Sequence, residues 1–183
     1  HEGKTGNGFS MREELIELII ERLERDLGPI RAEFTSERPV KTKYCAIDDL
    51  LPADIAQRIS DAFPDSGQMR LLDSFREKKY TSKSLDQFDP LIADITFAFQ
   101  DKRVIDKVAA LTGIKDAVGD PHLYAGGISA MGHRHAPVEV LAVRPWGAGR
   151  WSGCWIGTGR RSLLTGTRYW IPTQAVDDVR EEE

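Results

Sequence analysis

Apolar positions recur at helical spacing in several segments between residues 11 and 112. The segment 11–27 places charged residues on one face and an apolar stripe on the other, formed by Leu15, Ile16, Ile19, Ile20, Leu23 and Leu27. Gly28 and Pro29 are expected to end this helix. The same spacing predicts helices over 48–63, from Asp89 onward and from Asp101 to Gly113, where Asp101 suits an N-cap and Gly113 a C-terminal cap. Residues 11–115 are therefore predicted to be mostly helical, with a few strands.

Extended segments are fewer and shorter. The stretch 40–47 is rich in residues that favour strands, and 69–85 combines a short strand with a basic stretch. Residues 121–131 predict a strand inside a sheet, whose paired glycines allow close approach of the backbone. Two further candidate strands lie at 138–143 and 163–171.

The composition changes along the chain. Up to Lys115 there are nine Lys and nine Arg, whereas the rest holds seven Arg and no Lys. All four Trp fall in the last 38 residues, a segment without clear helical or alternating periodicity. We therefore expect an atypical part at 133–183 after a regular part at 11–132. The polar residues 1–10 are expected to be a disordered leader.

Charge and hydropathy argue against two classes of protein, nucleic-acid binders and membrane-spanning proteins. The formal net charge of -4 argues against a general nucleic-acid binder, because such domains are usually basic. No apolar run approaches the roughly 18 residues that a membrane helix needs. The two cysteines, Cys45 and Cys154, lie far apart, and free thiols are favoured over a disulfide. These features predict a cytoplasmic protein with neither nucleic-acid nor membrane partners.

Two histidines one residue apart, His133 and His135, are the candidate metal ligands. In a strand such residues share a face, so both imidazoles could reach one metal ion. Two exposed loop histidines have the same spacing and are more common. A downstream carboxylate ligand would have to be Glu139, Asp177, Asp178 or one of the terminal glutamates. A zinc site that adds Cys154 is a weaker alternative, since it lacks a clear fourth ligand.

Other polar residues suggest less specific chemistry. The stretch 75–85 carries Arg76, Lys78 and Lys79 beside Tyr80, which suits an acid or a phosphate but also a solvated edge strand. His122 is expected to serve packing. The segment rich in Arg and Trp could stack bases, but the overall acidity counts against this.

Three stretches, "FREKKYTSKSLDQFDP", "ITFAFQDKRVIDKVAALTGIKD" and "DPHLYAGGISAM", occur in family-like order. Through them residues 11–131 resemble the N-terminal half of bacterial Fe(II)- and 2-oxoglutarate-dependent oxygenases of the prolyl-hydroxylase-like branch. The resemblance implies an α+β fold, a double-stranded β-helix (jelly roll) with N-terminal helices packed on one sheet. It also implies Fe(II), held by an H-x-D pair and a distant histidine, with open positions for 2-oxoglutarate and O₂.

The chain departs from that family pattern after Met131. Counting forward from the "LYAGGIS" strand brings the family's H-x-D positions to Val140 and Ala142, which cannot bind iron. His133 and His135 come too early, and no histidine follows them. An arginine for the 2-oxoglutarate carboxylate is not recognisable among the candidates Arg144, Arg150, Arg160, Arg161 and Arg168.

Two interpretations of 133–183 stay open: an out-of-frame reading of a GC-rich gene, or a divergent native ending. In either case the jelly roll is expected to be incomplete. The resemblance predicts an Fe(II)- and 2-oxoglutarate-dependent dioxygenase, a hydroxylase of unknown substrate, whose metal triad this chain lacks. The alternative is a non-catalytic remnant or a protein-binding domain.

Overall fold

A computed structural model describes residues 10–37, 43–73, 78–82, 84–113, 117–123, 127–133, 136–143, 151–152, 154–159 and 168–174. At residues 43, 44, 46 and 78, and from residue 131 onward, the description covers the backbone alone. His135, Trp146, the arginines between 134 and 161, and the acidic residues after 175 lie outside the described residues.

Helix α1 (Met11–Arg25) opens the described chain. The Ser10 hydroxyl accepts a hydrogen bond from the Glu13 amide at 3.3 Å and so caps the helix, with acidic residues in the first turn. Four of the six residues of the predicted apolar stripe are buried in the structure: Leu15, Ile16, Ile19 and Leu23. Ile20 is partly buried and packs against the same core, so the helical periodicity identified the inward face correctly.

The predicted end of this helix at Gly28 and Pro29 is wrong. Helix α1 ends at Arg25, and a second helix, α2 (Leu27–Thr35), begins two residues later with Gly28 and Pro29 inside it. Its first hydrogen bond runs from the Ile30 amide to the Asp26 carbonyl at 3.0 Å. Pro29 lies in the first turn, where amides have no partner within the helix, so its missing N–H removes no hydrogen bond.

The other helices are α3 (Ala53–Ala62), α4 (Pro90–Ala98) and α5 (Lys102–Thr112), with short 3₁₀ turns η1 (Ser66–Gln68) and η2 (Leu85–Gln87). The predicted helix starts at Asp89 and Asp101 are confirmed. Each aspartate accepts a hydrogen bond at 2.9 Å from the amide two residues on. Gly113 ends α5 in the left-handed conformation with φ of 74°, which favours glycine.

The strands are β1 (Lys43–Asp48), β2 (Arg70–Asp73), β3 (Lys78–Ser82), β4 (Gly127–His133), β5 (Ala136–Val143), β6 (Trp151–Ser152), β7 (Cys154–Gly159) and β8 (Arg168–Gln174). They form one antiparallel sheet in the order β1-β8-β7-β5-β4-β3-β2, and β6 pairs with β8. Of the described strands, the first along the chain therefore lies beside the last. The predicted strand at 121–131 begins later than expected, because residues 121 and 122 form a turn.

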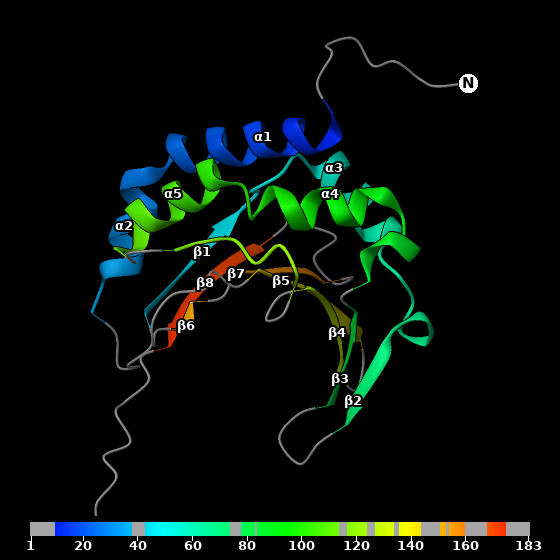
Figure 1. The fold of residues 1–183 in the computed structure, drawn as a ribbon. Helices are drawn as coiled ribbons and strands as arrows, with labels where there is room; N and C mark the ends of the chain where they lie inside the picture. The colour runs from blue at the N-terminus through cyan, green and yellow to red at the C-terminus, as the bar shows by residue number, and fades with distance from the viewer. Residues whose placement is uncertain are drawn as a thin grey trace, which may run out of the picture.

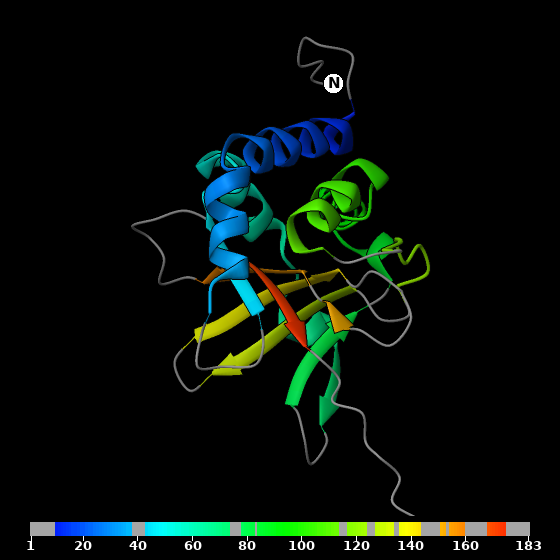
Figure 2. The ribbon, with the colours of Figure 1, turned by 90° about the vertical axis from the view of Figure 1, so that its left-hand side faces the viewer.

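The helices form a layer over one face of the curved sheet, and the opposite face is turned away from them (Figures 1 and 2). Helix α1 packs on α4 and α5, and α2 packs on α5 and β1. The buried core joins side chains of these helices to Ile47, Ile128 and Ala130 of the sheet. The described part of the chain thus has its core between the helix layer and the sheet.

The strand register shows which residues of the neighbouring strands lie on the face of the sheet that contacts the helices. Ile128 pairs with Leu141, Leu141 with Ile156, Ile156 with Tyr169 and Tyr169 with Ile47. Paired residues of an antiparallel sheet lie on the same face. The positions between the buried Ile128 and Ile47 therefore fall in the row that faces the helices.

The described strands belong to one sheet, whereas a jelly roll has two facing sheets. The double-stranded β-helix accordingly stays a prediction. Among the described helices, none is both long and apolar enough to cross a membrane.

The two cysteines lie on strands that are not neighbours. Cys45 is in β1 and pairs with Ile171 of β8, while Cys154 is in β7 on the other side of β8. Two strand spacings amount to roughly 9–10 Å. A disulfide needs Cα atoms closer than about 7 Å. Cys45 is a buried thiol that forms no disulfide, as the sequence predicted.

Arg103 of α5 links that helix to α1 through several carboxylates. Its guanidinium donates to both carboxylate oxygens of Glu13 at 2.7 and 2.9 Å, to Glu17 at 3.0 Å and to Asp101 at 2.9 Å. The hydrogen bonds from Arg103 hold the pKa of Glu13 and the pKa of Asp101 below their ordinary values of 4.5 and 3.8. The same hydrogen bonds, that with Glu13 first, raise the pKa of Arg103.

Replacing Arg103 by methionine is expected to lower the thermal midpoint at neutral pH more than the same change at Lys102, its exposed neighbour. Because the two carboxyl pKa values are depressed in the folded state, their contribution is present above pH 4.5 and is lost as the pH falls through the depressed values. Scanning calorimetry of both variants from pH 7 to pH 2 checks this. A gap between Arg103→Met and Lys102→Met that persists at the acid end would contradict it.

Candidate functional site

The predicted metal ligands fall at the end of strand β4. His133 is the last residue of β4 and pairs with Ala136, the first residue of β5. His135 lies outside the described residues. The structure therefore fixes the backbone position of one of the two histidines.

The faces of β4 follow from its buried residues. Ile128 and Ala130 belong to the core under the helices. Successive residues of a strand alternate between faces, so positions 129, 131 and 133 belong to the opposite face. The position of His133 is thus on the face of the sheet turned away from the helices.

The one candidate carboxylate within the described residues, Glu139, is on the opposite face of the sheet. Glu139 of β5 pairs with Ala130, so its position belongs to the face that carries the helices. A residue at this position cannot share a metal ion with one on the far side of the sheet. Cys154 pairs with Val143, which alternates with Glu139 along β5 and shares its face. The register therefore separates His133 from both candidates, Glu139 for iron and Cys154 for zinc.

The positions to which the resemblance assigns an H-x-D pair do share the face of His133. Val140 pairs with Ser129, and Ala142 pairs with Gly127. Their side chains have no atom that binds iron. In the described part of the chain, no three His, Cys, Asp or Glu side chains come together as a metal site. The residues at these positions therefore do not fit an iron triad.

Of the candidate arginines for 2-oxoglutarate, Arg168 alone is within the described residues. It lies in β8 and pairs with Gly157, which pairs with Val140. Its position is therefore on the same face as His133, but three strands away from β4. Three strand spacings amount to about 14 Å.

Ser129 is a residue that the sequence did not single out. It is 8% exposed, although its position is on the face away from the helices. Its cross-strand neighbours are Thr81 of β3 and Val140 of β5. The alternation of Ile128, Ser129 and Ala130 was the signal that could have identified a polar residue inside a buried strand.

The turn before β4 is attached to the end of α4. The Gln100 side-chain oxygen accepts a hydrogen bond from the Asp120 amide at 2.8 Å, and Asp120 is itself buried. His122, in the same turn, has an exposed side chain. The prediction that His122 serves packing is therefore wrong.

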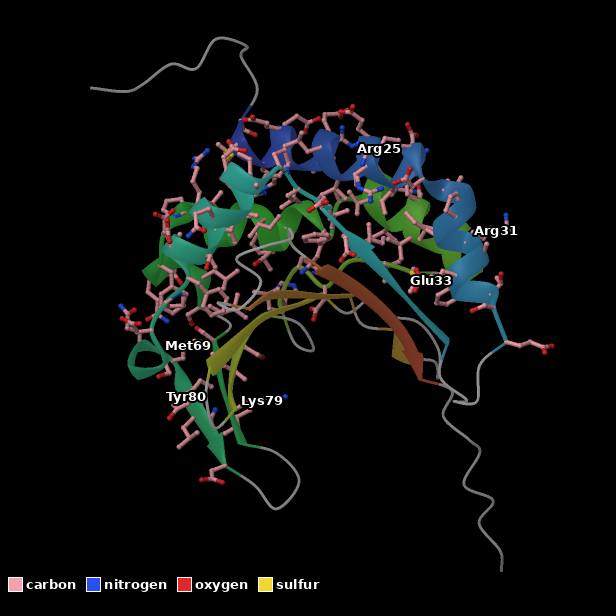
Figure 3. The ribbon with its side chains drawn as sticks, turned by 180° about the vertical axis from the view of Figure 1, so that it is seen from behind. Arg25, Arg31, Glu33, Met69, Lys79 and Tyr80 are labelled. Carbon is pink, nitrogen blue, oxygen red and sulfur yellow. The ribbon has the colours of Figure 1, made fainter. Side chains whose placement is uncertain are left out.

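Side chains of the basic stretch at 75–85 lie on both faces of β3. Lys79 and Tyr80 extend to opposite sides of the strand, with Lys79 on the side away from the helices (Figure 3). Tyr80 packs against the core. Arg76 lies outside the described residues, as does the side chain of Lys78. The described part of this stretch places one cation, Lys79, on the face of His133.

Comparison with known proteins gives no match: no family model, no curated protein and no solved structure is significantly similar to this chain.

Proposed function

We propose that the chain is built on the domain of Fe(II)- and 2-oxoglutarate-dependent dioxygenases, hydroxylases whose substrate the sequence does not name. Two observations support this. The three stretches that carry the resemblance fall on β3 and the start of α4, on α4 and α5, and on β4. Strands β3 and β4 are neighbours, and α4 and α5 belong to the layer that covers the sheet. These stretches thus occupy two neighbouring strands of the sheet and part of the helix layer that covers it.

In this proposal the metal triad of the chain is incomplete. The observation that carries this part is the register of β4 and β5, which puts His133 and Glu139 on opposite faces. A 2-His-1-carboxylate triad needs its ligands on one side of an iron ion. In a complete family member, iron and 2-oxoglutarate supply the activation of O₂. Here the residues at the corresponding positions, Val140 and Ala142, contribute no ligand.

The second candidate is a non-catalytic remnant or a protein-binding domain. The apolar pair Val140 and Ala142 favours it, because no conservative change turns either residue into an iron ligand. Such a domain keeps its helix layer and its sheet without needing a metal. Stoichiometric iron binding would favour an active dioxygenase over both an incomplete domain and a binding domain, since the active enzyme alone requires iron.

Anaerobic calorimetry of the chain with Fe(II), in the presence of 2-oxoglutarate, tests the proposal. We expect weak binding or none, because two histidines without a carboxylate on their face make an incomplete site. His133→Ala and His122→Ala, a control at the exposed histidine, should then behave alike. Stoichiometric binding at micromolar concentration that His133→Ala abolishes and His122→Ala preserves would overturn the incomplete triad.

A further inference from the structure

Two hydroxyl residues are neighbours on the face of the sheet turned away from the helices. Ser129 of β4 pairs with Thr81 of β3, so their side chains share this face. Ser129 is only 8% exposed, and neither hydroxyl forms a hydrogen bond with a described residue. Burying a hydroxyl without a hydrogen-bond partner is unfavourable. The Ser129 hydroxyl therefore points to a partner that the described part of the chain does not supply.

Two cations lie around Thr81 on the same face. Arg70 of β2 is exposed and pairs with Thr81 on the side opposite Ser129. Lys79 precedes Thr81 by two residues along β3 and extends to the inside of the curved sheet (Figure 3). Asp73, the one acidic residue in β2, β3 and β4, is three residues from Arg70 and so belongs to the opposite face. The described side chains of this part of the face thus include two cations and no carboxylate.

Thr81 is at the centre of a group of four hydrogen-bond donors. Arg70 and Ser129 lie directly across from it on the two neighbouring strands, and paired residues have Cβ atoms about 5 Å apart. Lys79 is about 7 Å away along the strand, a distance that its long side chain can span. Guanidinium, ammonium and hydroxyl groups are the donors that bind phosphate oxygens in proteins. We propose that these four residues bind the phosphate group of a small phosphorylated molecule.

The number and placement of the donors favour a phosphate over a carboxylate. A carboxylate offers two oxygens in one plane, whereas a phosphate monoester offers three acceptor oxygens around a tetrahedral centre. Donors from three adjacent strands approach from different directions, which suits the tetrahedral group. The group is also separate from the candidate metal ligand, because His133 lies four residues beyond Ser129 along β4, roughly 13 Å away. Phosphate binding here requires neither a metal ion nor a complete triad.

Calorimetry of the full chain with glycerol phosphate, in a buffer free of inorganic phosphate and iron, tests the proposal. Glycerol and 2-oxoglutarate are the comparison ligands, since the first lacks the phosphate and the second carries carboxylates instead. We expect glycerol phosphate to bind more tightly than either. Ser129→Ala and Thr81→Val should each weaken its binding by about tenfold, the effect of losing one hydrogen bond to a charged group. Arg70→Met should weaken binding at least as much, because it removes a charge as well.

Matched changes away from the donor group are the controls. Ser82→Ala removes a hydroxyl from the opposite face of β3, since Ser82 pairs with the buried Ile128, and Arg31→Met removes an exposed guanidinium from α2. Both variants should bind glycerol phosphate as the unmodified chain does. Because the Ser129 hydroxyl has no partner among the described residues, Ser129→Ala should also leave the thermal midpoint unchanged. This separates a role in ligand binding from a role in the fold.

Four results would overturn the proposal. They are no binding of glycerol phosphate, equal binding of 2-oxoglutarate or glycerol, equal loss in Arg70→Met and Arg31→Met, and unchanged binding in both Ser129→Ala and Thr81→Val. If Ser129→Ala does not fold, Thr81→Val against its control on the opposite face of β3 still decides. Since no iron is present, failure of phosphate binding leaves the expected weak binding of Fe(II) unaffected.

Discussion

Replacing Leu15 by alanine is expected to lower the free energy of unfolding by about 2–5 kcal/mol, the range for leucine truncation in a packed core. Leu15 is 0% exposed and lies in α1, which packs on both α4 and α5. Truncation removes apolar surface from the core and leaves a cavity that the neighbouring helices can fill only in part. Urea unfolding followed by circular dichroism measures the change.

The matched control is Leu27→Ala, the same substitution at the one stripe position that the structure leaves 36% exposed. It should change stability by no more than roughly 0.5 kcal/mol, as surface substitutions do. If Leu15→Ala fails to fold, Ile19→Val gives a graded version with an expected loss of about 0.5–1.5 kcal/mol. Equal effects of the two leucine substitutions would contradict the assignment of the inner face of α1.

The helical half of the fold was largely predictable because its signals are local. Asp101 and Gly113 bound α5 as expected, since an N-cap carboxylate and a left-handed glycine act within one turn. The signal at Gly28 and Pro29 was local too, but it was ambiguous. The same two residues can end one helix or occupy the first turn of the next, and the break at Asp26 decided between these.

The sheet and the candidate site were less predictable because they depend on pairing between distant strands. Strand β7 has no alternation that marks it, since an apolar run at 154–156 is followed by Gly157, Thr158 and Gly159. The pairing of Trp155 with Trp170 across β7 and β8 likewise has no sequence signal. That Glu139 and His133 fall on opposite faces follows from the register, which spacing along the chain does not determine.

The second large effect concerns the atypical segment after residue 132. Its strands β5, β7 and β8 pair within the sheet, but strand pairing alone does not make amides resist exchange. Amides exchange slowly where local opening of the segment costs a large free energy, because the opening exposes buried apolar surface. The segment gathers Arg, Gly and four Trp without a clear apolar period, and the family resemblance stops at Met131. We therefore expect residues 133–183 to be loosely packed and the chain to be prone to aggregate through open strand edges.

Hydrogen exchange measured by mass spectrometry tests most directly whether the proposed dioxygenase-like domain is incomplete. We expect fast exchange across 138–171 and slow exchange in α1, α4 and α5. The helices provide the internal reference within the same sample, so a variant is not needed. Exchange across β5, β7 and β8 as slow as in the helices would contradict the account. In that case Leu141, Ile156 and Tyr169 complete the buried row between Ile128 and Ile47, and the ending is a native part of the fold.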